Sequence, residues 1–148
     1  MIGEGTKSIT LKNYELIEHT ADIGIRVRAR DLKELFKNAA LAMFDIIAER
    51  SNTENIRAEK INLKQAADNL EELFINWLNE LLSLSATGEL IFSGFQIHKL
   101  DENHLDSTLI GTDIKGYKVN TEIKAATYHQ LKIEEDKTGW MVEVIFDV

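Results

Sequence analysis

The sequence contains no cysteine and no proline. The absence of cysteine excludes disulfide scaffolds, thiolate zinc sites and cysteine nucleophiles. The absence of proline means that turns must be built from Gly, Asn, Asp and Ser. No apolar run approaches the roughly 20 residues of a membrane-spanning helix, and the first residues lack the apolar stretch of a signal peptide. These absences lead us to expect a soluble, cytoplasmic protein with no membrane partner.

Negative charge outnumbers positive charge. The 148 residues include 25 acidic and 17 basic side chains, which gives a formal net charge of -8. This balance argues against a broad basic surface for nucleic acid, and we expect no DNA partner, although a small local contact stays open. With 44% apolar and 28% charged residues, the composition is that of a globular protein. We expect one domain over residues 14–148, preceded by a flexible lead-in over residues 1–13.

The hydrophobic pattern predicts two strands and a helix at the start of this domain. Residues 14–18 have the composition of a short strand, and residues 23–30 alternate between apolar and polar side chains, as a half-buried strand does. The alternation places three side chains on the solvent face, namely Arg26, Arg28 and Arg30. Asp31 and Glu34 have the spacing of a helix N-cap and its capping-box partner, and helical spacing continues to about residue 48.

A second helix and a run of strands follow. Residues 56–63 alternate with a shift in parity, which suggests a β-bulge or two short strands. Asp68 and Glu71 repeat the cap spacing before an apolar helical stripe, and Gly88 is placed to end that helix in a left-handed conformation. Strands are then expected at residues 91–100, 105–111, 119–128, 131–135 and 140–146. The order of elements predicts an α+β two-layer sandwich, with two amphipathic helices on one face of a largely antiparallel or mixed β-sheet.

Three segments carry side chains suited to chemistry. The turn at residues 18–22 includes Asp22, which either bonds the local backbone or contributes to a metal or phosphate site. At the chain end, Asp147 lies beside the α-carboxylate of Val148, and paired carboxylates suit hard cations such as Ca²⁺ or Mg²⁺. The alternative is an exposed charge at a frayed end. Lys124, in an alternating stretch, is either a solvated strand lysine or a site residue.

Several common motifs are absent from the sequence. The four histidines have no zinc-site spacing, and there is no HExxH helix. The chain also lacks a GxxxxGK[ST] phosphate loop, a GxGxxG turn and a serine nucleophile elbow.

The candidate residues belong to an ordered set of segments that reaches from Tyr14 to the last residue. The segments are residues 14–22, 39–44, 73–82, 123–129 and 144–148. In this order and with this ending, the sequence resembles the archease family. The resemblance implies an accessory protein of tRNA splicing and RNA repair, not an enzyme. Its partner would be the RNA ligase that joins 3′-phosphate or 2′,3′-cyclic-phosphate ends to 5′-hydroxyl ends, and RNA would be met through that ligase.

The resemblance also implies how this activation works and which residues take part. Archeases promote guanylylation of the ligase and sustain its multiple turnover. Asp22 and Asp147 would line a divalent-cation site, often described with calcium, to which Val148 can contribute; Mg²⁺ and Mn²⁺ are alternatives. Lys124 matches the lysine of the motif and is a functional candidate. Two histidines are further candidates without an assigned role, His19 and His129.

Two other functions stay open. One is a chaperone-like binding module with broad clients. The other is a small metal-dependent phosphohydrolase that uses a cation at Asp22 and Asp147 to activate water, although no general base is evident.

Overall fold

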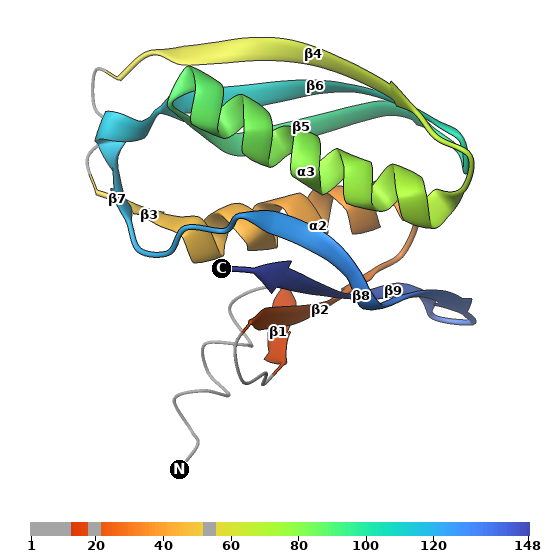
Figure 1. Cartoon of the computed structure of the whole chain (residues 1–148). Helices are drawn as coiled ribbons and strands as arrows, with labels where there is room; N and C mark the ends of the chain where they lie inside the picture. The colour runs from red at the N-terminus through yellow and green to blue at the C-terminus, as the bar shows by residue number, and fades with distance from the viewer. Residues whose placement is uncertain (1–12, 18–21, 52–55) are drawn as a thin grey trace.

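The computed structural model describes residues 13–17, 22–51 and 56–148 (Figure 1). Two long helices are present there, α2 (Leu32–Ile47) and α3 (Leu70–Gly88), with one short 3₁₀ helix, η1 (Ile114–Gly116). The strands are β1 (Tyr14–Ile17), β2 (Ile23–Ala29), β3 (Ala48–Arg50), β4 (Ala58–Ala66), β5 (Leu90–Leu100), β6 (His104–Asp113), β7 (Tyr117–Val119), β8 (Ala125–Asp136) and β9 (Gly139–Asp147). None of the described helices is long and apolar enough to cross a membrane.

The start of α2 follows the predicted capping pattern. The Asp31 side chain accepts a 2.9 Å hydrogen bond from the Glu34 backbone N–H. In return, the Glu34 carboxylate accepts from the Arg30 N–H at 2.8 Å. The first bond satisfies a donor that a helix N-terminus would otherwise leave unpaired. The second differs from a capping box by one residue, because Glu34 bonds the N–H of Arg30 and not that of the N-cap Asp31. The prediction that the helix begins after Asp31 is therefore confirmed.

The ends of α3 differ from the prediction by one residue. The N-cap is Asn69, not Asp68, and its side chain accepts from the Glu72 N–H at 2.8 Å. Asn and Asp are equally good N-caps, so the sequence offers two registers and the packing of the helix chooses between them. At the other end it is Glu89, and not Gly88, that is left-handed, with φ 54°.

A close contact explains the glycine at position 88. A Cβ atom on Gly88 would lie 3.2 Å from Leu90 Cδ1. Glycine therefore makes room for the Leu90 side chain as the chain turns into β5, and it does not supply the left-handed conformation.

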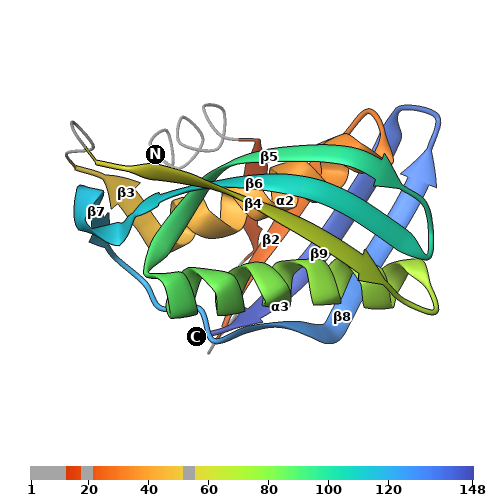
Figure 2. The same ribbon diagram turned by 90° about the horizontal axis from the view of Figure 1, so that it is seen from above.

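The strands form three antiparallel sheets. The orders are β1-β2-β9-β8, β4-β6-β5 and the pair β3-β7. Both helices lie between the two larger sheets: α2 contacts β2 and β5, and α3 contacts β8 and β5 (Figure 1, Figure 2). The α+β class with antiparallel pairing is confirmed.

The layering differs from the single helix-covered sheet that the sequence predicted. In α3 the buried residues include the consecutive run Leu73, Phe74 and Ile75. In α2 they include Ala39, Ala40 and the run Ala42–Phe44. Such helices bury more than one stripe, which is typical of a helix covered on two sides.

Two strand predictions are corrected by the pairing. β4 is one strand in unbroken register with β6, from Ala58 opposite Thr112 to Ala66 opposite His104. The apparent parity shift arises because Ile56 precedes the strand and Ala58 lies on its exposed face, opposite the half-buried Ile61 and Leu63. Residues 119–128 and 131–135 are not two separate strands: residues 120–124 are irregular, and β8 continues through Gln130, whose φ is 53°. The register between β8 and β9 shifts there, between Thr127 and Lys132.

The core is aromatic where the helices meet. Phe36 of α2 packs edge-on against Phe74 of α3, with ring centroids 5.2 Å apart. Trp77 is fully buried, and its indole N–H donates to the Phe36 carbonyl at 3.0 Å. The buried indole therefore has the hydrogen-bond partner that such a group requires.

Candidate functional site

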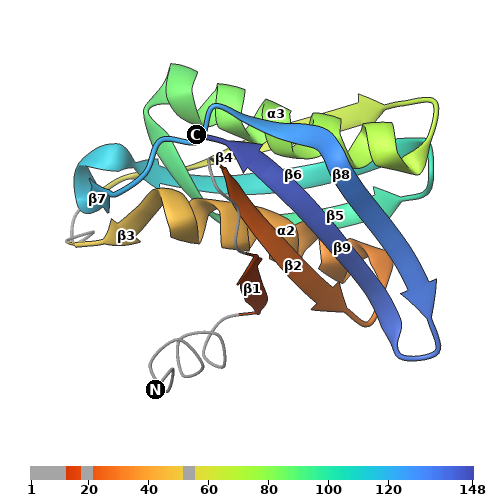
Figure 3. The same ribbon diagram turned by 60° about the horizontal axis from the view of Figure 1, so that its bottom comes forward.

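Three segments that are distant in sequence meet at one end of the four-stranded sheet. β2 begins there, β8 begins there and β9 ends there, next to the C-terminus (Figure 3). Ile23 is paired with Phe146, which places Asp22 and Asp147 at the same level on neighbouring strands. Ala125 is paired with Asp147, and the Lys124 N–H donates to the Asp147 carbonyl at 2.8 Å. The antiparallel register thus brings Asp22, Lys124 and Asp147 to the same end of the sheet.

The side chains at this edge are accessible. Lys124 and Asp147 are exposed, Asp22 is half-buried and Val148 is 38% exposed. Ile123 is buried, with 6% of its surface exposed, so it anchors the segment that presents Lys124. We call Asp22, Lys124, Asp147 and Val148 the sheet-end site.

The two histidine candidates do not extend the described part of this site. His19 lies outside the described residues. His129 is exposed on β8, beyond Thr127, which is paired with Ile145. The register therefore places His129 further along the sheet than the sheet-end site.

The oxygen donors of the sheet-end site fit a hard cation. Asp22, Asp147 and the α-carboxylate of Val148 offer only oxygen ligands, which Ca²⁺ and Mg²⁺ prefer. Within residues 13–17, 22–51 and 56–148, no three histidine or acidic side chains form a metal-binding group. The available set there is two aspartates and the chain terminus, so a cation at this edge would keep several waters.

One residue of the neighbourhood was missed by the sequence analysis. The side chain of Asn79 in α3 bonds both backbone groups of Ala126 in β8: Nδ2 donates to the carbonyl at 3.1 Å, and Oδ1 accepts from the N–H at 2.8 Å. Asparagine is a weak helix former, so an asparagine between the buried residues Leu78 and Leu81 was the sequence feature that could have indicated a specific role.

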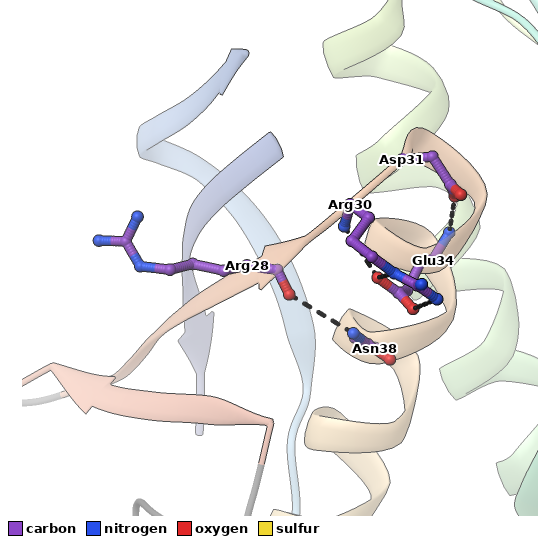
Figure 4. Close-up of polar contacts among 5 residues, drawn as sticks. All are labelled: Arg28, Arg30, Asp31, Glu34 and Asn38. Carbon is purple, nitrogen blue, oxygen red and sulfur yellow. Dashed lines mark hydrogen bonds and ion pairs between the residues drawn. The ribbon is translucent and has the colours of Figure 1, made fainter. Parts of the chain in front are cut away.

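A separate cleft of about 390 Å³ lies at the opposite end of β2. Arg30 and Glu34 form a 3.1 Å ion pair on its wall, and Asn38 Nδ2 donates to the Arg28 carbonyl at 3.5 Å (Figure 4). The Arg28 side chain points away from α2 (Figure 4). Across the cleft, hydrogen bonds from Thr138 hold the pKa of Asp136 below its usual value, with a smaller contribution from the Arg28 charge.

The charges of this cleft are balanced. Arg30 is paired with Glu34, and the charge of Arg28 lies near that of Asp136. The balance gives the cleft no preference for a ligand of either charge. It is therefore a weaker candidate than the sheet-end site.

Sequence comparison identifies the family of small α+β proteins to which this chain belongs. The model of the archease protein family matches residues 14–148. The archease of Methanosarcina barkeri is 36% identical over 143 residues, covering 93% of this chain and 97% of that protein. The archease of Methanothermobacter thermautotrophicus is 35% identical, covering 93% of this chain and all of that protein. The chain belongs to the archease family.

Two solved structures share the fold. The solution structure of protein 1598 from Methanobacterium thermoautotrophicum has a TM-score of 0.66 and 30% identity, covering 92% of this chain and 99% of that one. A Thermotoga maritima crystal structure, described as an archease and possible chaperone, has a TM-score of 0.63 and 26% identity. It covers 89% of this chain and 94% of that one.

Proposed function

We propose that this protein is a non-catalytic, cytoplasmic accessory protein that activates an RNA ligase in tRNA splicing and RNA repair. The ligase joins 3′-phosphate or 2′,3′-cyclic-phosphate ends to 5′-hydroxyl ends. The protein promotes guanylylation of the ligase and so sustains its multiple turnover. The ligase is the direct partner, and RNA is met through it. Membership of the archease family supports this proposal.

The observation that carries the proposal is the convergence of Asp22, Lys124 and Asp147 at one accessible end of the sheet. An accessible sheet-end site can enter a partner's nucleotide site without rearrangement of the fold. There, the Lys124 ammonium would act as a point charge toward phosphate oxygens. The carboxylates would act on the divalent cations that accompany a nucleotide.

The sheet-end site would also bind a cation of its own. Asp22 and Asp147, with the Val148 α-carboxylate, would hold one divalent cation, with Ca²⁺ first and Mg²⁺ or Mn²⁺ as alternatives. When bound, the cation would neutralise the repulsion between the carboxylates and present a positive charge at the edge. Lys124 would then face the partner beside that charge.

A multiple-turnover ligation assay tests the proposal. The partner ligase, GTP and a large excess of RNA with the appropriate broken ends are incubated with and without this protein, and the guanylylated fraction of the ligase is followed. We expect many products per ligase only when the protein is present, and a loss of stimulation for Lys124→Ala. The matched control is Lys132→Ala, another exposed lysine associated with β8. Equal turnover with and without the protein would refute the proposal.

A chaperone-like role is the second candidate, because the Thermotoga relative is described as a possible chaperone. The large exposed apolar side chains of the described residues lie on different parts of the chain: Leu16, Val119, Tyr128 and Val148. Suppression of the aggregation of unrelated proteins, measured by light scattering, would support this role. If aggregation were suppressed while ligase turnover stayed unchanged, the chaperone role would replace ligase activation.

A further inference from the structure

The edge strand β8 of the four-stranded sheet is held near its first residue by a side chain from α3. β8 is the last strand in the order β1-β2-β9-β8, and Ala126 is paired with Phe146 of β9 on one side. On the other side, the carboxamide of Asn79 bonds both the N–H and the C=O of Ala126, at 2.8 and 3.1 Å. A carboxamide has one acceptor and a donor group, as a peptide unit does. Asn79 therefore takes the place of a neighbouring strand.

This contact lies two residues from Lys124. The segment before β8 is irregular, and the Asn120 and Thr121 N–H groups both bond the Ile47 carbonyl, at 2.8 and 3.2 Å. After Lys124, the next hydrogen bonds to a helix within the described residues are those between Ala126 and Asn79. The Lys124 N–H in turn bonds the Asp147 carbonyl at 2.8 Å.

The contrast with Asn76 shows that the contact is specific to one position. Asn76 lies one turn earlier on α3 and is exposed. Its backbone carbonyl accepts from Gln65 Nε2, but its side chain has no hydrogen bond within the described part of the chain. Only Asn79 of this pair is aimed at β8, which runs beside α3 (Figure 2).

We infer that Asn79 is a positioning residue that fixes the start of β8, so that Lys124 stands in register with Asp147 and Asp22. This inference rests on the proposed function, because the site that it serves is the sheet-end site. Asn79 itself does not touch the ligase or the RNA. It fixes the position of the backbone from which Lys124 projects. A small displacement of a functional group can cost a large factor in rate.

Amide hydrogen exchange tests the structural part without any ligase. In Asn79→Ala, the Ala126 N–H should exchange at least about tenfold faster because it loses its acceptor. The inference further requires faster exchange at the Lys124 N–H, whose acceptor is Asp147. Asn76→Ala, the same substitution one turn earlier, should change neither. If only Ala126 responded, Asn79 would be a local tie and the inference would be wrong.

Ligase stimulation tests the functional part. We expect Asn79→Ala to stimulate ligase turnover about tenfold less than the unmodified protein, and Asn76→Ala to stimulate it normally. Asn79→Asp keeps the acceptor but places a carboxylate oxygen against the Ala126 carbonyl. Protonation of that carboxyl restores a donor, so stimulation relative to the unmodified protein at the same pH should recover as the pH falls. A loss of stimulation that does not depend on the bond to Ala126, such as irreversible misfolding of the variant, would not recover in this way and would contradict the inference.

The outcomes separate this inference from the proposed function. If Lys124→Ala and Asp147→Asn lose stimulation while Asn79→Ala retains it, the positioning role is wrong and the proposed function stands. If Lys124→Ala and Asp147→Asn retain stimulation, the sheet-end site is not the working surface, and the role of Asn79 fails with it.

Discussion

Tyr14 carries a phenol that is bonded across the molecule. Its hydroxyl donates to Asp45 Oδ2 of α2 at 2.7 Å, which ties the edge strand β1 to the helix layer. Burial, and then the bonded carboxylate, raise the pKa of Tyr14 above its ordinary value of 10.0, because both disfavour the phenolate. The bond that ties β1 to α2 therefore exists only while the Tyr14 hydroxyl is protonated.

Tyr14→Phe should lower the free energy of unfolding by about 1 to 2 kcal/mol at neutral pH, because a hydrogen bond to a charged group is lost. The folded-state pKa is raised, so this contribution is fully present below the unfolded pKa of about 10 and falls as the pH rises above it. Urea unfolding of both proteins between pH 7 and pH 11 checks this. A difference that is zero at pH 7, or that stays constant above pH 10, would contradict it.

The arginines of β2 differ in their partners. Arg26 Nε is 2.7 Å from Glu143 Oε2, and its Nη1 is 3.7 Å from Glu15 Oε1. These carboxylates raise the pKa of Arg26, through the Glu143 hydrogen bond first. Arg28 is exposed and makes no ion pair with the described residues; its charge only lies near that of the exposed Asp136.

Arg28→Glu should therefore change the free energy of unfolding by about 0.5 kcal/mol or less, as ordinary surface substitutions do. Arg26→Glu should cost about 1 kcal/mol or more, because it places a third carboxylate between two others. Thermal unfolding at low and high salt distinguishes them, since salt should reduce the cost of Arg26→Glu. A larger loss for Arg28→Glu would mean that the solvent face of β2 was misassigned.

At the scale of elements, local patterns carry the helices and most strands. The cap spacing and apolar stripes predicted α2 and α3, and alternation placed Arg28 outside and Val27, which is fully buried, inside. Local patterns did not predict which strands pair, because the order β4-β6-β5 depends on contacts between distant segments. For the same reason the second sheet over the helices was missed.

Leu78→Ala tests the helix layer. Leu78 is fully buried in α3, so truncation should cost about 2 to 5 kcal/mol by leaving a cavity. The matched control is Leu16→Ala in β1, where the side chain is 60% exposed and little burial is lost. Chemical denaturation of both variants provides the comparison. Equal losses of unfolding free energy in the two variants would contradict the placement of Leu78 in the core.

Gly139→Ala tests the hairpin between β8 and β9. Gly139 has φ 134°, and a Cβ atom there would lie 2.2 Å from the Ala29 carbonyl oxygen. A backbone clash cannot be relieved by a side-chain rotation, so we expect a loss above about 2 kcal/mol. Gly88→Ala is the milder comparison, because its Cβ would meet side-chain atoms of Leu90 at 3.2 Å, which need to shift by only a few tenths of an ångström, and no backbone atom. Melting temperatures of the two variants should differ clearly; similar values would refute the argument.

At the scale of the whole molecule, the sheet-end site exists only because three segments that are distant in sequence meet at one end of the four-stranded sheet. Asp22, Lys124 and Asp147 could be chosen from the sequence as chemically suitable residues. Their convergence depends on the register of β2, β9 and β8, which no local pattern reports. Asn79 was missed because its partner is a backbone segment far along the chain.

Calcium titration calorimetry tests the predicted cation site. Asp22→Asn and Asp147→Asn keep the size of the side chain but remove the charge that a hard cation needs, so each should weaken Ca²⁺ binding by about tenfold or more. Asp68→Asn, an exposed aspartate before α3, is the control and should bind normally. Because each substitution removes one of the two like charges of the predicted site, both site variants should melt at or above the temperature of the unmodified protein in metal-free buffer.

The chain terminus is tested separately, by adding one residue after Val148. This displaces the α-carboxylate and leaves Asp147 paired with Ala125. If the terminus is a ligand, the extended chain should bind Ca²⁺ more weakly and stimulate the ligase less, in step with the aspartate variants. Unchanged binding would restrict the site to the two aspartates. If Asp22→Asn and Asp147→Asn both stimulated the ligase normally despite weak Ca²⁺ binding, the cation would have no part in activation, and Lys124 would remain as its candidate residue.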